Sequence, residues 1–243
     1  MKHRICIAFL LLSFSVSSVF AQVVTREKAL ATNVINAMGG TTAFRNVPYI
    51  SWQFFEKRTI TWDKWNGDVR IDYLDQPLTI IVNLRADKVM VARDGKRMTD
   101  TDSLAYYLDK GRTIWMNDSY WLFMPFKLLD KGVILHYMGK GETVDGKETE
   151  VLELTFRQVG ATPLNKYHIH IDPGTYDVLQ WDYYIRTDEE QPTIITPWTD
   201  YKWYGKIRLS SGRGSFGKIT NIKLPDSLPA FTFRDPVKPL QGF

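Results

Sequence analysis

Apolar side chains recur at every second position through the segment from residue 52 to residue 92. The alternation falls into five runs, at residues 52–54, 60–62, 69–73, 78–82 and 88–92. A period of two is typical of β-strands with one buried face. Asn66-Gly67 and Asp94-Gly95 lie between runs and suit tight turns, because these residue pairs tolerate positive φ. The pattern therefore predicts five successive strands in an antiparallel meander.

A helix is expected before these strands. Its apolar positions have the spacing of one helix face: Leu30, Val34, Ala37 and Met38. Thr25 can cap its start, and Gly39-Gly40 ends the pattern. A one-turn helix over residues 42–46 is expected next, stopped by Pro48.

Residues 100–129 interrupt the alternation and predict two helices. Leu104, Tyr107 and Leu108 indicate a first helix that runs to Gly111. Asn117-Asp118-Ser119 are expected to cap a second one that begins at Tyr120. Residues 120–126 have almost no polar face, so they must be buried on both sides, as a covered piece or a lid. Seven residues are too few to cross a bilayer.

Period-two patterns resume after residue 132. They predict further strands at residues 133–138, 151–156, 167–172, 176–185, 198–209, 218–223 and 231–233. Turns are expected at Asp145-Gly146 and Pro173-Gly174. The expected fold is α+β, with a single curved antiparallel sheet of eleven or twelve strands. This sheet would form a half-barrel whose concave face is covered by the helices.

The first 21 residues have the pattern of a signal peptide. Lys2 and Arg4 precede the apolar stretch 7–20, and Val19-Phe20-Ala21 forms a cleavage site. Cys6, the only cysteine, precedes this stretch and so is not placed as a lipid-modified cysteine. The prediction is a periplasmic protein with one domain over residues 22–243, without a disulfide or a membrane span.

Charge and aromatic content narrow the functional classes. Residues 22–243 carry 29 basic and 27 acidic side chains. This near balance argues against a nucleic-acid partner. The chain has 8 tryptophans, 12 tyrosines and 13 phenylalanines. Such a density fits a large β-sheet surface or an apolar binding cavity, and composition does not separate the two.

The order of these elements, with Asp94-Gly95-Lys96 after the first meander and residues 231–236 near the end, resembles the LolA-like superfamily of periplasmic lipoprotein carriers and lipid-binding proteins. Residues 117–122 are similar, more closely, to an uncharacterised LolA-like family of Gram-negative bacteria. Residues 152–156 and 180–182 match the same pattern. The resemblance extends over nearly the whole chain after the leader.

The resemblance implies a cavity that holds a lipid or the acyl chains of a lipoprotein, with an envelope protein as a possible further partner and no cofactor. Each methylene removed from water contributes about 0.8 kcal/mol. It also implies an arginine that helps to hold the lid. That residue is not assigned, since Arg58 and Arg70 both lie on early strands.

Candidate binding residues follow from the two apolar regions. The expected cavity wall consists of alternating residues of the first meander: Trp52, Phe54, Trp62, Ile71, Tyr73, Ile80 and Val82. The expected lid consists of residues between the two meanders: Leu104, Leu108, Trp115, Trp121, Leu122 and Phe126.

Two alternatives remain open at this point. His168 and His170 share one strand face and His136 is a third candidate ligand, so a zinc enzyme is one of them. An envelope interaction module with a filled core and no guest is the other. Residues 212–217 satisfy G-x-G-x-x-G, but a strand pattern follows instead of a helix, which favours a hairpin loop over a nucleotide site.

Overall fold

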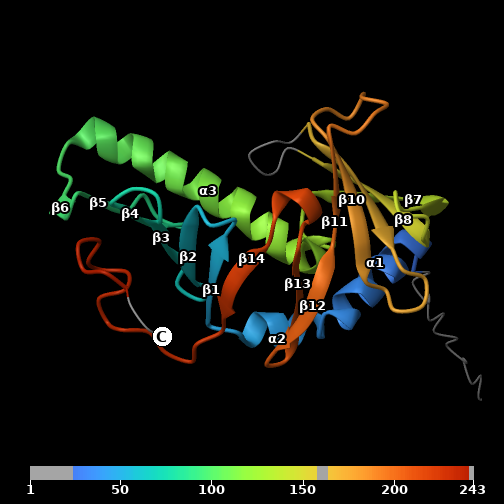
Figure 1. Ribbon diagram of the computed structural model, residues 1–243, viewed down its shortest axis with the longest axis horizontal. Helices are drawn as coiled ribbons and strands as arrows, with labels where there is room; N and C mark the ends of the chain where they lie inside the picture. Colours follow the sequence, from blue (N-terminus) through green and yellow to red (C-terminus); the bar gives the residue numbers. More distant parts are fainter. Residues whose placement is uncertain (1–23, 158–163, 241–243) are drawn as a thin grey trace, which may run out of the picture.

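The computed structural model describes residues 24–157 and 164–240, which form two antiparallel sheets, a two-stranded ribbon and three α-helices (Figure 1). The predicted signal peptide lies outside the described residues. The chain opens with α1 (Arg26–Ala37) and α2 (Gly40–Asn46). Helix α1 is as the spacing of apolar residues predicts; Thr25 is its N-cap residue, but the Thr25 side chain makes no capping hydrogen bond. Helix α2 begins at Gly40, two residues before the predicted one-turn helix.

A seven-stranded sheet follows, in the order β14-β1-β2-β3-β4-β5-β6. Its strands are β1 (Tyr49–Phe54), β2 (Arg58–Asp63), β3 (Asp68–Tyr73), β4 (Leu78–Asn83), β5 (Val89–Arg93), β6 (Lys96–Arg97) and β14 (Ile219–Lys223). The five-strand meander is thus confirmed. Asp94 and Gly95 have φ of 52° and 70° and form the expected two-residue turn between β5 and β6.

A five-stranded sheet carries the second meander, in the order β11-β10-β9-β8-β7. Its strands are β7 (Val133–Glu142), β8 (Glu148–Phe156), β9 (Lys166–Ile171), β10 (Val178–Tyr184) and β11 (Ile194–Pro197). Asp145-Gly146 lies in the β7–β8 connection, as predicted. In β9 and β10, Ile169 and Trp181 are buried in the core, whereas their neighbours His168 and Asp182 lie on the opposite face.

The ribbon pairs β12 (Thr199–Tyr204) with β13 (Ile207–Gly212). The single strand predicted over residues 198–209 is therefore wrong, because the chain reverses after Tyr204. The short 3-10 helix η1 (Gly214–Phe216) then leads into β14. The G-x-G-x-x-G segment is a loop between strands, as expected. A Cβ at Gly212 would lie 2.1 Å from the Thr199 hydroxyl oxygen, so only glycine fits there.

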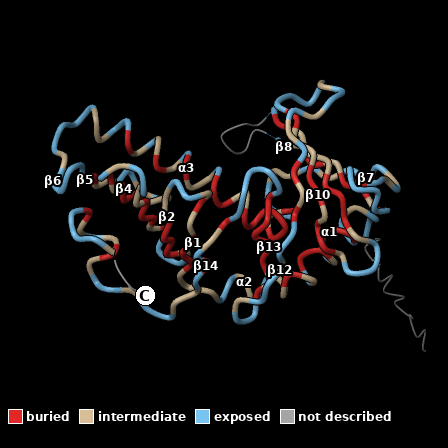
Figure 2. The backbone as a smooth tube through the Cα atoms, viewed as in Figure 1, coloured by how far each residue is buried: buried red, intermediate tan, exposed pale blue. Residues whose placement is uncertain are grey.

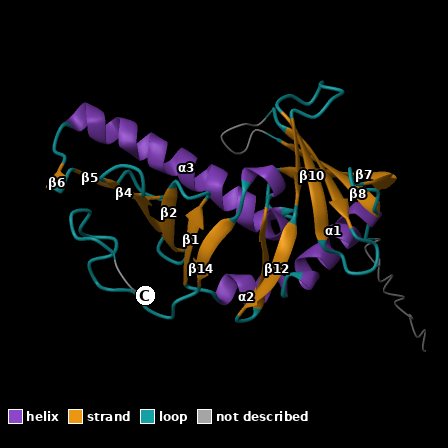
Figure 3. Ribbon diagram, viewed as in Figure 1, coloured by secondary structure: helices purple, strands orange, loops and turns teal. Residues whose placement is uncertain are grey.

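The prediction of a single half-barrel is wrong. The described strands form three separate sheets, and none of them is closed or strongly curled. The reason is visible in Figure 3: a long helix carries the chain away from β6, and β7 begins a new sheet at the other end of the molecule. Each of the two large sheets packs one face against its own cluster of buried side chains. The buried segments are red in Figure 2.

The long helix α3 (Thr101–Lys127) replaces the two helices expected between the meanders. Asp100 caps it, because its carboxylate accepts from the Ser103 backbone N–H at 3.1 Å. Asn117-Asp118-Ser119 are not a cap but part of the continuous helix, and Asp118 is fully buried there. Within the described residues, no helix is long and apolar enough to cross a bilayer.

The segment after β14 lies against the outer face of the seven-stranded sheet. Arg70, which is completely buried, donates to the carbonyl oxygens of Thr232, Asp235 and Lys238 at 2.9–3.2 Å. Residues 231–233 form turns, so the strand predicted there is wrong. The Thr232 carbonyl oxygen accepts a hydrogen bond from Arg70 instead of from a neighbouring strand.

Candidate functional site

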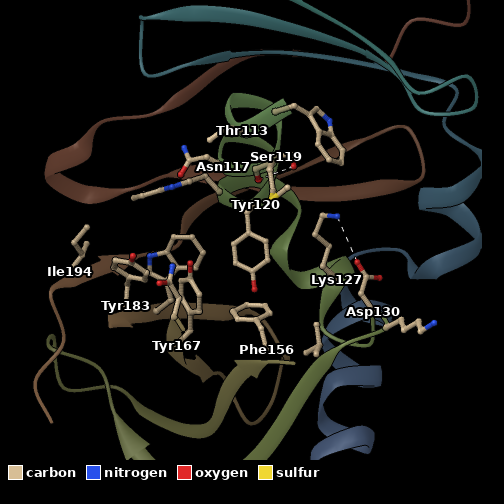
Figure 4. Close-up of a pocket in the computed structure, with 17 residues that line it drawn as sticks. Thr113, Asn117, Ser119, Tyr120, Lys127, Asp130, Phe156, Tyr167, Tyr183 and Ile194 are labelled. Carbon is tan, nitrogen blue, oxygen red and sulfur yellow. Dashed lines mark hydrogen bonds and ion pairs between the residues drawn. The ribbon is translucent and has the colours of Figure 1, made fainter. Parts of the chain in front are cut away.

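A pocket of about 480 Å³ lies between the second half of α3 and the five-stranded sheet (Figure 4). Its volume is within the range of sites that hold one small molecule. Seven of its lining residues are aromatic: Trp115, Tyr120, Trp121, Phe156, Tyr167, Trp181 and Tyr183. Three come from α3 and four from strands β8, β9 and β10 or their ends.

Tyr120 stands in the middle of the pocket and projects from α3 toward Phe156 (Figure 4). Its ring stacks on Trp181 with centroids 6.0 Å apart and an interplanar angle of 20°. Trp121 meets the same Trp181 ring edge-on at 5.0 Å. Tyr167 lies 5.5 Å from Tyr120 and 5.2 Å from Trp181. Contacts between rings of the protein itself therefore hold the aromatic wall in place.

Burial shifts the pKa of two phenol groups of the pocket. Burial raises the pKa of Tyr120 and the pKa of Tyr167 above the ordinary tyrosine value, so both stay protonated at neutral pH. Within the described residues, the hydroxyls of Tyr120 and Tyr183 line the pocket and make no hydrogen bond.

The opposite side of the pocket is charged. In Figure 4, Lys127 and Asp130 lie across Tyr120 from Tyr167, Tyr183 and Ile194. The Lys127 ammonium is 3.7 Å from the Asp130 carboxylate, and Lys131 also lines the pocket. The pocket thus has an aromatic side and a side with two lysines and one aspartate.

An ion pair holds the middle of α3 against the seven-stranded sheet. Arg58 on β2 donates two hydrogen bonds of 2.7 Å to the Asp118 carboxylate, whose side chain is fully buried. The pair raises the pKa of Arg58 above its ordinary value despite burial. Asn117 and Ser119, on either side of Asp118, line the pocket. The ion pair therefore fixes the helix segment that carries them.

A second arginine holds α3 one turn later. Pro125 has no N–H, so the carbonyl oxygen of Trp121 lacks its helical partner. Arg213, from the loop after β13, donates to that oxygen at 2.5 Å. It also packs over the Trp198 ring at 3.7 Å and donates to the Ser210 carbonyl oxygen. The loop after β13 thus places the Arg213 guanidinium against α3.

The predicted wall and lid residues meet each other directly. Six of the seven wall residues are buried and Tyr73 is partly buried, in the core between the seven-stranded sheet and α3. Trp52 packs edge-on against Phe123 at 5.4 Å, and Trp62 contacts Trp115 at 5.1 Å. All six predicted lid residues belong to α3 and pack in the same core. None of the wall residues lines the pocket, whereas Trp115 and Trp121 of the lid do. Guest contact by any of these residues stays a prediction.

The strand side of the pocket was not among the predicted binding residues. Trp181 and Tyr183 are two positions apart on β10, and Tyr167 on β9 pairs with Tyr183. The alternation of Trp181 and Tyr183 was present in the sequence. Alternation shows that they share one face of the sheet, but it does not show that α3 covers that face only in part.

The three histidines of the zinc alternative do not converge. Glu153 lies between His136 and His168 in the strand register. The ring nitrogens of His168 lie 3.3 Å from Glu153 and 3.1 Å from the Tyr184 hydroxyl. In the part of the chain that the structure describes, no three His, Cys, Asp or Glu side chains are placed to hold a metal ion. The geometry gives the zinc alternative no support.

No family model and no curated protein matches the sequence. Several solved structures are distantly similar. A DUF1329 family protein from Desulfovibrio piger is 15% identical, with a TM-score of 0.44 over 85% of this chain and 96% of that one. A domain assigned to outer membrane lipoprotein sorting, from Vibrio parahaemolyticus, is 11% identical, with a TM-score of 0.38 over 77% and 88%. A chain of the MucA/MucB complex of Pseudomonas aeruginosa is 18% identical, with a TM-score of 0.26 over 68% of this chain and 56% of that one. At TM-scores below 0.5, none of these likenesses defines a function for this chain.

Proposed function

We propose that this protein is a non-enzymatic periplasmic binding or carrier protein that holds a hydrophobic guest, a lipid or a lipoprotein acyl chain, in the pocket between α3 and the five-stranded sheet. The observation that carries this proposal is the aromatic lining. Seven rings surround a space of about 480 Å³, and rings packed against one another give an apolar surface that remains open to a guest.

The chemistry of the lining favours binding over reaction. Tyr120 and Tyr183 offer hydroxyl donors, and burial raises the pKa of Tyr120 above its ordinary value, so Tyr120 stays protonated. Such groups orient a polar part of a guest without exchanging protons with it at neutral pH. The apolar part gains from leaving water, at about 0.8 kcal/mol for each buried methylene.

Helix α3 acts as the cover of the pocket. Trp115, Trp121 and Tyr120 all project from it into the lining. Because the same helix packs on the seven-stranded sheet through Leu122 and Phe126, the cover is anchored on one side and free to contact a guest on the other.

The test is direct uptake of a neutral amphiphile. Dodecanol is added to the detergent-free protein, and binding is followed by tryptophan fluorescence and native mass spectrometry. Ile194→Trp fills the pocket, since Ile194 lines it beside Tyr183. Ile195→Trp is the matched control, because Ile195 is exposed and pairs with Asp182, whose side chain lies on the other face of the sheet.

We expect the wild type and Ile195→Trp to bind one dodecanol, and Ile194→Trp to lose at least tenfold in affinity. Equal binding by both variants would place the guest elsewhere. No uptake by the wild type would overturn the proposal and favour an interaction module with no guest.

A further inference from the structure

The positive charge beside the pocket exceeds the negative charge that faces it. Lys127 and Lys131 both line the pocket, together with one carboxylate, Asp130. The Lys127–Asp130 pair is long, at 3.7 Å, and the Asp130 side chain is 56% exposed, so it neutralises Lys127 only weakly. Within the described residues, Lys131 has no ion-pair partner.

A third lysine, Lys64, lies near Lys127. The Lys64 ammonium lies 3.8 Å from the centre of the Phe44 ring and donates to the Phe44 carbonyl oxygen. Among residues 24–157 and 164–240 it pairs with no carboxylate. Lys64 and Lys127 lie 5.9 and 5.7 Å from the rings of Trp62 and Trp115, which contact each other at 5.1 Å.

The two cations are close enough to affect each other. Burial, with the nearby charge of Lys127, lowers the pKa of Lys64 to about 8. Like charges held together in a partly buried place raise the local positive potential, and an anion placed beside them relieves this repulsion.

We infer that the guest is an anionic amphiphile with one apolar chain: its carboxylate or phosphate head lies between Lys127 and Lys131, and its chain lies on the aromatic side of Tyr120. This inference rests on the proposed function and adds the class of guest. The two sides face each other across Tyr120 in Figure 4, as the two ends of an amphiphile require.

The volume of the pocket sets the size of the guest. About 480 Å³ suits one small molecule and falls in the lower part of the range for ligand sites. A single chain with one compact headgroup is therefore the expected occupant, rather than a complete two-chain phospholipid.

Four amphiphiles with the same dodecyl chain test the inference: dodecanoate, dodecyl phosphate, dodecanol and dodecyltrimethylammonium, each used below its micelle concentration. We expect either anion, or both, to bind about tenfold more tightly than dodecanol, and the cation to bind more weakly than dodecanol. The preference between the two anions distinguishes a carboxylate head from a phosphate head. Added salt should weaken the anions more than dodecanol.

Matched variants locate the charge effect. The double variant Lys127→Gln/Lys131→Gln should bring the affinity for the anions down to that for dodecanol and leave dodecanol unchanged. Asp130→Asn should raise the affinity for the anions several-fold. Lys28→Gln, at an exposed position of α1, is the control and should change nothing.

The outcomes separate this inference from the proposed function. If dodecanol binds and the anions bind no more tightly, the anionic class is wrong and the binding function stands. If the double variant weakens dodecanol as much as the anions, the lysines act on the fold and the inference fails. If none of the four binds, the proposed function fails and this inference fails with it.

Discussion

Arg213 supplies to the carbonyl oxygen of Trp121 the hydrogen bond that a helix with proline at position 125 cannot make. The distance is 2.5 Å, and the arginine side chain is completely buried. Its other contacts are the backbone and hydroxyl oxygens of Ser210, the carbonyl oxygen of Gly212 and the Trp198 ring. The loop after β13 and the last turns of α3 therefore depend on each other.

Replacing Arg213 by methionine should destabilise the fold, because it leaves buried carbonyl oxygens without a donor. We expect a loss of about 1–3 kcal/mol in the free energy of unfolding, measured by urea titration. In a Pro125→Ala background the same replacement should cost about 1 kcal/mol less, since residue 125 then offers its N–H to Trp121. Equal costs in the two backgrounds would contradict the coupling.

The buried ion pair of Arg58 and Asp118 should show strong coupling. Asp118→Asn breaks a bidentate contact whose carboxylate is fully buried, and we expect it to cost about 2–4 kcal/mol. Arg58→Met/Asp118→Leu should recover a large part of this loss, because neither charge is then left unpaired. A double-mutant cycle on urea unfolding measures the coupling, and a value near zero would show that the two residues act independently.

Stability should depend on pH through Lys64. Its pKa falls from the ordinary 10.5 to about 8 in the folded protein. Between these two values the unfolded chain binds the extra proton, so this group makes stability rise with pH over that window; below about pH 8 the charged form carries its full cost. Solvent screening reduces that cost at this partly exposed side chain.

Lys64→Met should therefore stabilise the protein by about 1 kcal/mol at pH 7 and flatten the rise toward pH 10. Urea titrations across this range give the comparison, with Lys57→Met, at an exposed lysine, as the control. A profile in Lys64→Met as steep as that of the wild type would assign the rise to other groups.

Arg70 should hold the segment after β14 in place. Arg70→Ala removes the donor to the carbonyls of Thr232, Asp235 and Lys238, so we expect much faster hydrogen exchange in residues 229–240 while β2 and β4 stay protected. The control is Arg97→Ala. Arg97 is half-exposed; it lies 3.8 Å from Asp235 and makes a single hydrogen bond to this segment's backbone, to the Arg234 carbonyl oxygen at 3.2 Å, so its removal should speed exchange much less than removal of Arg70. Unchanged exchange in Arg70→Ala would mean that other contacts hold this segment.

The sequence predicts the local elements of this fold well, because periodicity reports which residues of a strand or helix share a face. The strands β1 to β5 and helix α1 follow from it directly. It does not predict where one sheet ends and the next begins, because that depends on α3 separating β6 from β7. Asn117-Asp118-Ser119 resemble a helix cap because short polar residues are usually found at helix ends. Asp118 is instead buried against Arg58, which lies sixty residues earlier in the chain, so no local pattern reveals this partner.

The position of the pocket could not be predicted from the sequence either, because it also depends on how distant elements pack. Tyr167, Trp181 and Tyr183 follow the alternation of a strand, and so do Trp52 and Trp62, yet only the first set faces a space that side chains leave open. The difference lies in how α3 crosses the two sheets, and no local spacing encodes it.

The sharing of α3 between two cores has a kinetic consequence. The helix buries Leu122 and Phe123 with the seven-stranded sheet, and it buries Met124 and its C-cap residue Leu128 with the five-stranded sheet and α1. To widen the pocket by moving α3, a guest must first break the contacts to Arg58 and Arg213. For the proposed guest, if it needs more room than the closed pocket gives, we therefore expect a residence time that lengthens with every contact that holds α3 down.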